Sequence, residues 1–186
     1  MNAGATVKNM KLENATTEKD LEQIRQLYMI SFPDSERKPF GMILDMQKSG
    51  HADVFKMMDP GFCGLLITMK NDDLLLVDYL AVDPASHSQG HGSKALEAFS
   101  QIYPGRPVVL EIEDPKGTAP DSVENRRLSF YLRNGFRVMD YTISLFDVPM
   151  KILVRQGSVT FDQYKSFLLD RLGGWADSHI LLVEQD

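Results

Sequence analysis

The sequence has few of the features that mark secreted, membrane-spanning or disulfide-bonded proteins. Cys63 is the only cysteine among 186 residues, so no intramolecular disulfide can form and cysteine usage gives no support to secretion. Residues 1–20 lack the apolar core of a signal peptide, and no apolar stretch reaches the length of a bilayer span. These absences predict a cytoplasmic protein without a membrane partner.

Dense basic clusters and metal-ligand spacings are missing as well. The chain has 20 Lys and Arg residues against 26 Asp and Glu residues, a formal net charge of −6. Nucleic acid is therefore not an expected partner, and a cationic acceptor is easier to attract than an anionic one. No metal site is predicted, because the histidines are scattered around Cys63 without a ligand pattern, at His51, His87, His91 and His179.

The length and composition suit a single domain with a sizeable core. Of the 186 residues, 43% are hydrophobic. No internal repeat, low-complexity segment or linker interrupts the chain. One domain over residues 1–186 is therefore predicted.

The most informative stretch passes from a strand through a loop to a helix. Leu74–Val82 is a short apolar run between polar turns, which favours a strand buried on both faces. From Ser93 onward, apolar residues recur at helical spacing. Gly90 and Gly92 precede this helix, where free N–H groups point outward and a side chain would keep a ligand away. Such a helix start binds anions, phosphates above all.

Periodicity and caps predict the other elements. Thr17 with Asp20, and Thr160 with Gln163, are capping patterns at the starts of a first and a last helix. Two more helices are expected, one around Phe40–Met46 and one over Ser122–Arg133 with Gly135 as its left-handed C-terminal residue. The remaining strands are expected at Val7–Glu13, Ala52–Met58, Cys63–Met69, Pro107–Glu113, Val138–Phe146 and Pro149–Arg155, and Ile180–Val183 is a possible edge strand or dimer contact.

The segment His87-Ser88-Gln89-Gly90-His91-Gly92, placed between strand and helix, resembles the acyl-CoA signature R/Q-x-x-G-x-G/A of the GNAT N-acyltransferase superfamily. In that family the loop amides hold the pyrophosphate of the cofactor. The resemblance therefore implies a cofactor-binding segment over His87, Ser88, Gln89, Gly90, His91, Gly92 and Ser93. His87 replaces the usual Arg or Gln, and a neutral imidazole donates one hydrogen bond without a permanent charge.

The element order is also similar to the GNAT order over about Val7 to Arg155. It implies an α/β (α+β) fold, with a mixed central sheet and helices on both faces, and acetyl-CoA as the acyl donor. Residues 156–186 follow as a C-terminal helix and a possible edge strand. Two strands, Leu74–Val82 and Pro107–Glu113, must then lie parallel if the helix between them is a right-handed crossover.

A second motif, ENRRLSFYLRNGF over Glu124–Phe136, resembles the GNAT helix whose tyrosine protonates the departing thiolate. Tyr131 matches that tyrosine. A phenol with an ordinary pKa of about 10 is protonated at neutral pH and can supply this proton. Many family members have an Asn seven residues before the tyrosine, where this chain has Glu124, so Asn125 is the candidate cofactor contact.

The attacking amine needs a carboxylate that can take its proton. Asp78 interrupts an apolar strand, where an acid is costly unless it is paired or used. Strand alternation puts Glu111 and Glu113 on one face, which could equally be a solvated side. Asp78 and Glu111 are the predicted acceptor-orienting and proton-accepting pair, with the identity of the base left open, and Glu113 and Glu36 are predicted substrate contacts.

The resemblance also assigns a role to the backbone of the strand that carries Asp78. In the GNAT fold this strand bulges and splays from the next one, so that its amides pair with pantetheine and polarise the thioester carbonyl. Leu80, Ala81 and Val82 correspond to those residues. The same apolar side chains would suit any core strand.

Two rival functions differ in class. Gly90–Ala95 fits the dinucleotide pattern G-x-G-x-x-G/A, with Glu111 about twenty residues on, but a seven-residue connection separates strand and glycine, which disfavours an NAD-binding oxidoreductase. A non-catalytic acyl-CoA sensor or partner-binding domain is suggested by His87 and Asn125, whereas the presence of Tyr131, Asp78 and Glu111 argues against it. The sequence favours an N-acetyltransferase that acts on a small-molecule or peptide primary amine by direct attack in a ternary complex, with a homodimer possible.

Overall fold

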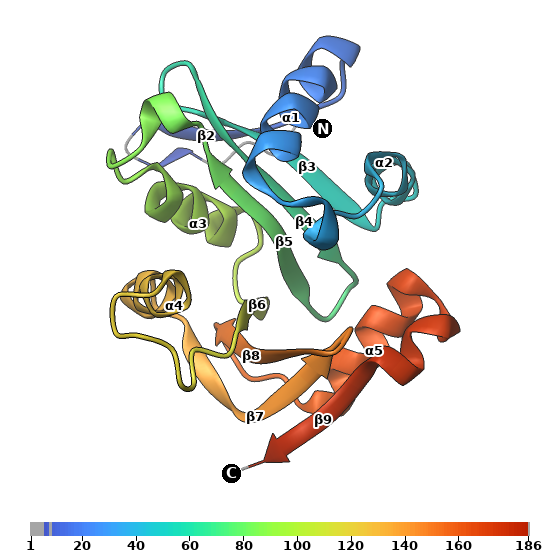
Figure 1. Cartoon of the computed structure of the whole chain (residues 1–186). Coiled ribbons are helices and arrows are strands. Elements are labelled where there is room, and N and C mark those ends of the chain that lie inside the picture. The colour runs from blue at the N-terminus through green and yellow to red at the C-terminus, as the bar shows by residue number, and fades with distance from the viewer. Residues whose placement is uncertain (1–5, 8, 186) are drawn as a thin grey trace. The chain divides into compact units, whose positions relative to one another are not determined.

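The computed structural model describes residues 6–7 and 9–185, and these divide into two units (Figure 1). The first unit contains the described residues up to Lys70 together with Val77–Pro104. The second contains Asn71–Leu76 and the chain from Gly105 onward. The single domain inferred from composition stays a prediction.

The sheet of the first unit has the strand order β1-β2-β3-β4-β5. From β1 to β4, each strand pairs antiparallel with the next one along the chain. These strands are β1 (Thr6–Val7), β2 (Met10–Asn14), β3 (Ala52–Met58) and β4 (Phe62–Lys70). β5 (Leu75–Val82) is the next neighbour and belongs to this unit from Val77 onward. The predicted strands over 52–82 are confirmed.

The predicted first strand, Val7–Glu13, is wrong in one respect. It is two strands rather than one, because the chain turns at Asn9, whose φ is +82°, and Val7 then pairs with Met10. Asparagine tolerates this left-handed conformation better than most residues, since its short polar side chain can bond locally. Lys8 lies outside the described residues.

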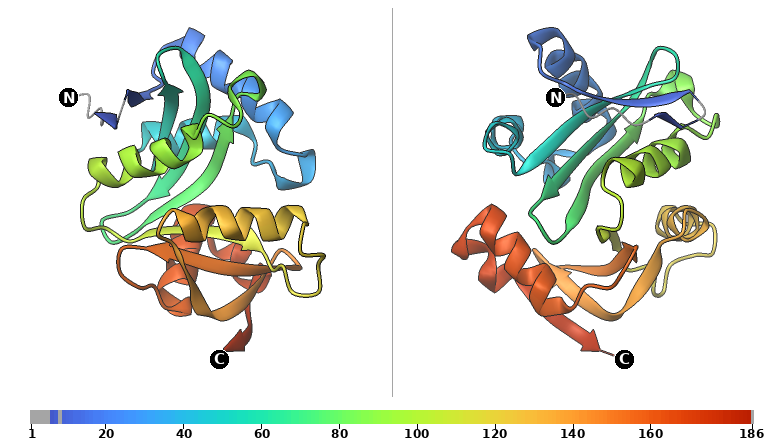
Figure 2. Two further views of the ribbon diagram at one scale, coloured as in Figure 1. Left: turned by 90° about the vertical axis from the view of Figure 1, so that its left-hand side faces the viewer. Right: turned by 180° about the vertical axis from the view of Figure 1, so that it is seen from behind.

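Three helices cover the sheet of the first unit, with α1 and α2 on one face and α3 on the other (Figures 1 and 2). They are α1 (Glu18–Ser31), α2 (Phe40–Lys48) and α3 (His91–Ile102). Short 3₁₀ turns, η1 (Asp34–Glu36) and η2 (Pro84–Ser86), lie in the connections. Because both faces are covered, β4 is buried along almost its whole length, as its apolar sequence requires.

The sequence cues for the first helices are confirmed, with one difference at α3. The Thr17 hydroxyl accepts a hydrogen bond from the Asp20 amide and begins α1, whose buried stripe is Ile24, Leu27 and Tyr28. α3 begins at His91, two residues before the predicted start. The reason is that Gly90 is its N-terminal cap, with φ +74°, and a glycine cap carries no polar side chain to signal the start.

The sheet of the second unit has the order β5-β6-β8-β7-β9. Leu75 and Leu76 of β5 pair parallel with Val108 and Val109 of β6 (Val108–Glu113), so the predicted parallel crossover is confirmed. β7 (Arg137–Leu145) and β8 (Val148–Arg155) confirm the two strands predicted there, and they pair as an antiparallel hairpin. β9 (Ile180–Gln185) pairs antiparallel with β7 at the end of the sheet, which confirms the edge strand.

Two helices flank the sheet of the second unit on opposite faces (Figure 2). α4 (Val123–Arg133) is capped at its start by the Ser122 hydroxyl. Gly135 follows its end with φ +79°, as predicted, and the ring of Phe136 packs against that of Tyr131. α5 (Phe161–Leu172) begins with the predicted capping box of Thr160 and Gln163. The 3₁₀ turn η3 (Gly174–His179) leads into β9. Across the described helices, none is long and apolar enough to span a membrane.

Candidate functional site

The predicted phosphate loop has the geometry of an open helix start. Gly90 adopts a left-handed conformation, and a Cβ added to it would meet no atom within 4 Å. The first intrahelical hydrogen bond runs from the Lys94 amide to the Gly90 carbonyl, 3.1 Å away. Gly90 has no side chain that could cap the N–H groups ahead of Lys94, and the first turn contains no acid. This terminus can therefore accept an anionic group.

The single N–H of a neutral His87 imidazole is not directed at the start of α3. Its Nε2 lies 3.0 Å from the Val82 carbonyl oxygen. Because a carbonyl oxygen can only accept, Nε2 must donate here, so the neutral imidazole has no second N–H for a phosphate. His87 thus anchors the loop to the end of β5, and its own contact with the cofactor stays a prediction.

Asp59 forms a polar cluster with His91 and Lys94 at the start of α3, and the sequence did not indicate this cluster. Asp59 Oδ2 lies 2.6 Å from Lys94 Nζ and 3.3 Å from His91 Nδ1. The hydrogen bond from Lys94 lowers the pKa of the Asp59 carboxyl. The His91 side chain is only 4% exposed, so this residue can contribute to a ligand site mainly through its backbone. The exposed residues of the loop are His87, Ser88, Gln89 and Gly90, and Ser93 is half-buried.

The strand that precedes the loop passes close to β4. The Asp83 amide donates to the Cys63 carbonyl over 2.9 Å, and a Cβ added to Gly64 would collide with the Ala81 carbonyl. Glycine at position 64 is therefore needed for this approach. Leu80 and Val82 are half-buried and Ala81 is buried, which fits the predicted use of their backbone without testing it.

Asp78 is paired with a residue that sequence reasoning missed. Lys38 Nζ donates to Asp78 Oδ1 over 2.7 Å, and only 6% of the Asp78 side chain is exposed. Among the described residues, Asp78 Oδ2 is buried without a hydrogen-bond partner. A buried carboxylate oxygen that lacks a donor is costly, and this makes Asp78 a candidate ligand for an ammonium or amine.

Two tyrosines hold the segment between α1 and α2 over this part of β5. The Tyr79 hydroxyl accepts from the Lys38 amide over 3.0 Å and donates to the Glu36 carbonyl over 2.9 Å. The Tyr28 hydroxyl donates to the Lys38 carbonyl over 3.0 Å. Burial raises the pKa of Tyr28 well above its ordinary value, and Tyr79 adds to the shift. The predicted substrate contact Glu36 has an exposed side chain, and its carbonyl is fixed by Tyr79.

In the second unit, Glu111 contacts a helix outside the motifs. The Tyr164 hydroxyl on α5 donates to Glu111 Oε1 over 2.6 Å. In β6 the residues Val108, Leu110 and Ile112 are buried and Glu111 and Glu113 are half-buried, as the predicted alternation requires, but Val109 on the face of the two acids is buried too. Tyr164 lies on the buried face of α5, and nothing in the sequence pattern indicated that it has a carboxylate partner.

Tyr131 lies near the end of α4 between two aromatic rings. Its ring meets those of Phe130 and Phe136 edge-on, with centroids 5.1 and 5.6 Å away. Desolvation raises the pKa of its hydroxyl, although the nearby Arg127 opposes this. The phenol therefore stays protonated at neutral pH, as the predicted proton donor requires.

The side chain of Asn125 is occupied locally. Its Nδ2 donates to Thr118 Oγ1 and to the Ala119 carbonyl, both over 2.9 Å, and lies 3.3 Å from Ser122 Oγ. An amide has two N–H donors, so these contacts leave its carbonyl oxygen for any ligand. The assignment of Asn125 to the cofactor stays a prediction.

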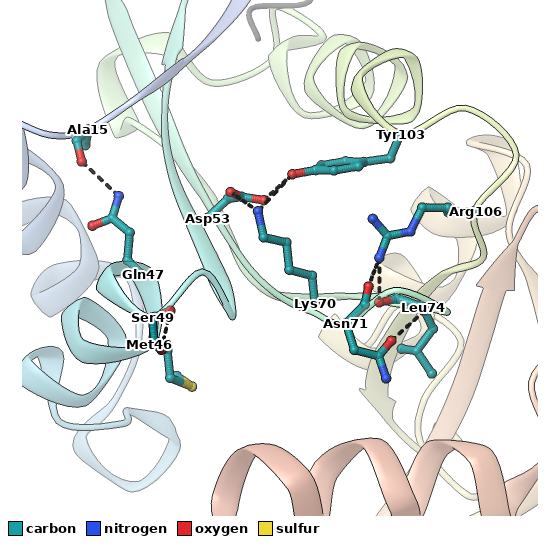
Figure 3. A network of polar contacts seen from close by, with 10 residues as sticks. All are labelled: Ala15, Met46, Gln47, Ser49, Asp53, Lys70, Asn71, Leu74, Tyr103 and Arg106. Carbon is teal, nitrogen blue, oxygen red and sulfur yellow. Dashed lines mark hydrogen bonds and ion pairs between the residues drawn. The ribbon is translucent and has the colours of Figure 1, made fainter. Parts of the chain in front are cut away.

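A third polar cluster braces the first unit away from the motifs (Figure 3). Lys70 Nζ lies 2.6 Å from Asp53 Oδ1 and 3.1 Å from the Tyr103 hydroxyl, which in turn donates to Asp53 Oδ2 over 2.6 Å. These residues join β3, β4 and the end of α3. Within the described part of the chain, no group of three His, Cys, Asp or Glu residues is arranged to hold a metal ion.

The fold is similar to that of known acetyltransferases. A protein described as a GNAT-family acetyltransferase from Bacteroides thetaiotaomicron is 22% identical, with a TM-score of 0.73 over 89% of this chain and 98% of that one. An aminoglycoside 6'-N-acetyltransferase complexed with coenzyme A is 10% identical, with a TM-score of 0.62 over 78% and 95% of the two chains. The ribosomal-protein-S18-alanine N-acetyltransferase from Escherichia coli is 17% identical, with a TM-score of 0.57 over 81% and 96%.

No protein-family model and no curated protein matches the sequence. At these identities the structural likeness is one of fold. It confirms the predicted fold class, the GNAT acyl-CoA N-acyltransferase fold.

Proposed function

We propose that this protein is a GNAT-type N-acetyltransferase that moves an acetyl group from acetyl-CoA to a primary amine by direct attack in a ternary complex. The observation that carries the proposal is the uncapped, glycine-opened start of α3 at Gly90, directly after β5. Backbone N–H groups at such a terminus bind phosphate through hydrogen bonds and the helix dipole. Residues 87–93 would hold the diphosphate of acetyl-CoA there.

Each remaining site residue has a role that its surroundings support. Asp78, with Oδ2 buried and unpartnered, would orient the acceptor amine. Glu111 would accept a proton, directly or through a water. Tyr131, kept protonated by desolvation, would give its proton to the departing thiolate. The amides of Leu80, Ala81 and Val82 would pair with the pantetheine arm and polarise the carbonyl.

The acceptor is proposed at the level of its reacting group. Two of the proteins with this fold are named for amine acceptors, an aminoglycoside and the alanine of a ribosomal protein. These two acceptors support amine chemistry on this fold, and the acceptor of the present chain is proposed to be either a small molecule or a peptide. Glu36 and Glu113 are the proposed contacts of the acceptor, and Asn125 is a proposed contact of the cofactor.

The first experiment is a calorimetric titration with acetyl-CoA, with CoA and NAD as comparators, followed by thiol-release assays over a panel of amines. Acetyl-CoA binding with amine-dependent thiol release is expected. Binding without release for any amine would favour a non-catalytic acyl-CoA sensor. Binding of NAD alone would reject the proposal.

A further inference from the structure

Glu111 is hydrogen-bonded to a residue that lies 53 positions away, outside both motifs. Tyr164 comes from α5, in the part of the chain that follows the elements of the GNAT order. Its side chain is fully buried, at 0% exposure. The donated hydrogen bond to Glu111 Oε1 is short, at 2.6 Å, as expected for a hydroxyl that donates to a carboxylate.

The helix that carries Tyr164 is firmly held at its start. The Thr160 hydroxyl and the Gln163 side chain form a complete capping box, and the Tyr164 amide donates to the Thr160 carbonyl over 3.0 Å. Phe167 and Leu168 continue the buried face of α5. The Tyr164 hydroxyl is therefore a donor with little freedom to move, whereas a glutamate side chain has three rotatable bonds.

Charged residues on β6, β8 and α5 lie on both faces of the sheet. Glu113 shares the strand face of Glu111. On the adjacent strand, Lys151 is opposite Ile112 and so belongs to the other face, where its Nζ contacts Thr142 Oγ1 at 2.5 Å. On α5, Lys165 is paired with Asp177 at 2.9 Å. Tyr164 is thus the titratable group of α5 that the structure shows bonded to Glu111.

We infer that Tyr164 is a positioning residue that fixes the Glu111 carboxylate and favours its ionised form for proton transfer from the acceptor amine. The inference rests on the proposed function, because it assigns a purpose to Glu111 that only amine acetylation requires. A hydrogen bond donated to a carboxylate stabilises the charged form. The C-terminal helix would thereby take part in the site as well as in the packing of the second unit.

The test compares Tyr164→Phe with Tyr141→Phe. Both changes remove one buried hydroxyl from the second unit and keep the ring, but Tyr141 donates to the backbone carbonyl of Val159 over 3.0 Å. The side-chain carboxyl of Glu111 is titrated by carbon-13 NMR in the full chain. We expect Tyr164→Phe to raise the Glu111 titration midpoint by about one pH unit and Tyr141→Phe to leave it in place.

The kinetic arm uses amine-dependent thiol release from acetyl-CoA. Tyr164→Phe is expected to lower kcat about tenfold with an unchanged Kd for acetyl-CoA, since one misplaced proton acceptor affects the chemical step. An unmoved Glu111 midpoint, or a moved midpoint with unchanged kcat, would overturn the inference. Absence of thiol release from the unmodified protein would overturn the proposed function instead, and the NMR titration, which needs no activity, would then decide whether Tyr164 controls Glu111.

Discussion

The Lys38 ammonium lies 2.7 Å from Asp78 Oδ1, although forty positions separate the two residues in the chain. The pair joins the segment between α1 and α2 to the strand that leads into the phosphate loop. The Asp78 side chain is 6% exposed and that of Lys38 is 23% exposed. Lys38 is therefore the counter-charge that makes an acid in the middle of an apolar strand tolerable.

Removing Lys38 should destabilise the first unit. Lys38→Met leaves the Asp78 carboxylate buried without a cation, and we expect a loss of about 2 kcal/mol in the free energy of unfolding, reduced from the cost at a fully buried pair because Lys38 is partly exposed. Urea unfolding measures the change. Adding Asp78→Asn should recover part of it, because the unpaired charge is then gone.

The matched control for this prediction is Lys48→Met. Lys48 pairs with Asp45 at 3.5 Å, and both side chains are more than three-quarters exposed. An exposed pair of this kind contributes little, so the change should stay within about 0.5 kcal/mol. Equal losses for Lys38→Met and Lys48→Met would contradict the assigned role of Lys38.

Gly90→Ala should weaken acetyl-CoA binding at the phosphate loop. An alanine at φ +74° costs about 1–2 kcal/mol of strain. Its methyl group would occupy the open space at the helix start, where we propose that the diphosphate binds. We expect a Kd for acetyl-CoA at least tenfold higher by calorimetry. Gly50→Ala is the control, because Gly50 has φ +80° and equally open surroundings but ends α2 far from the loop in sequence. It should lower stability by a similar amount and leave the Kd unchanged.

Tyr131→Phe should slow turnover and spare cofactor binding. The change removes the hydroxyl that we propose protonates the thiolate and keeps the edge-on contacts with Phe130 and Phe136. A lost general acid typically costs a factor of about 10² or more in kcat. Thiol-release kinetics and calorimetry together check the prediction. Turnover equal to that of the parent protein would remove Tyr131 from the mechanism.

Stability should fall at alkaline pH, partly through the cluster of Asp53, Lys70 and Tyr103. Burial raises the pKa of Tyr103, and Asp53 adds to it. Burial by itself would lower the pKa of Lys70, but the hydrogen bonds with Asp53 and Tyr103 outweigh this and raise it. Both groups bind their protons more tightly in the folded state. Their contribution is therefore complete below about pH 10 and is lost as the pH rises through the folded values.

Tyr103→Phe tests this pH dependence. One such proton changes the slope of the unfolding free energy against pH by at most about 1.4 kcal/mol per pH unit. Above about pH 10 the variant should lose stability less steeply than the parent protein, as measured by urea unfolding between pH 7 and 11. Identical slopes would show that Tyr103 does not titrate with folding.

Much of the fold could be predicted because its signals are local. The caps at Thr17, Ser122 and Thr160 each act within three or four residues, and each begins a helix where the sequence predicted one. The two errors are also local. A single left-handed residue, Asn9, divides the first strand, and Gly90 begins α3 without a capping side chain.

The sequence by itself determined the order of elements, the glycine-opened helix start and the candidate acids, because periodicity, caps and turns depend on neighbouring residues. Only the tertiary structure decided which partners those acids have. Lys38 reaches Asp78 across forty positions and Tyr164 reaches Glu111 across 53, and no spacing rule encodes either contact. Such pairs arise when packed helices and strands bring distant side chains within hydrogen-bond range. Burial increases the free-energy contribution of each contact, because an unpaired buried polar group is costly.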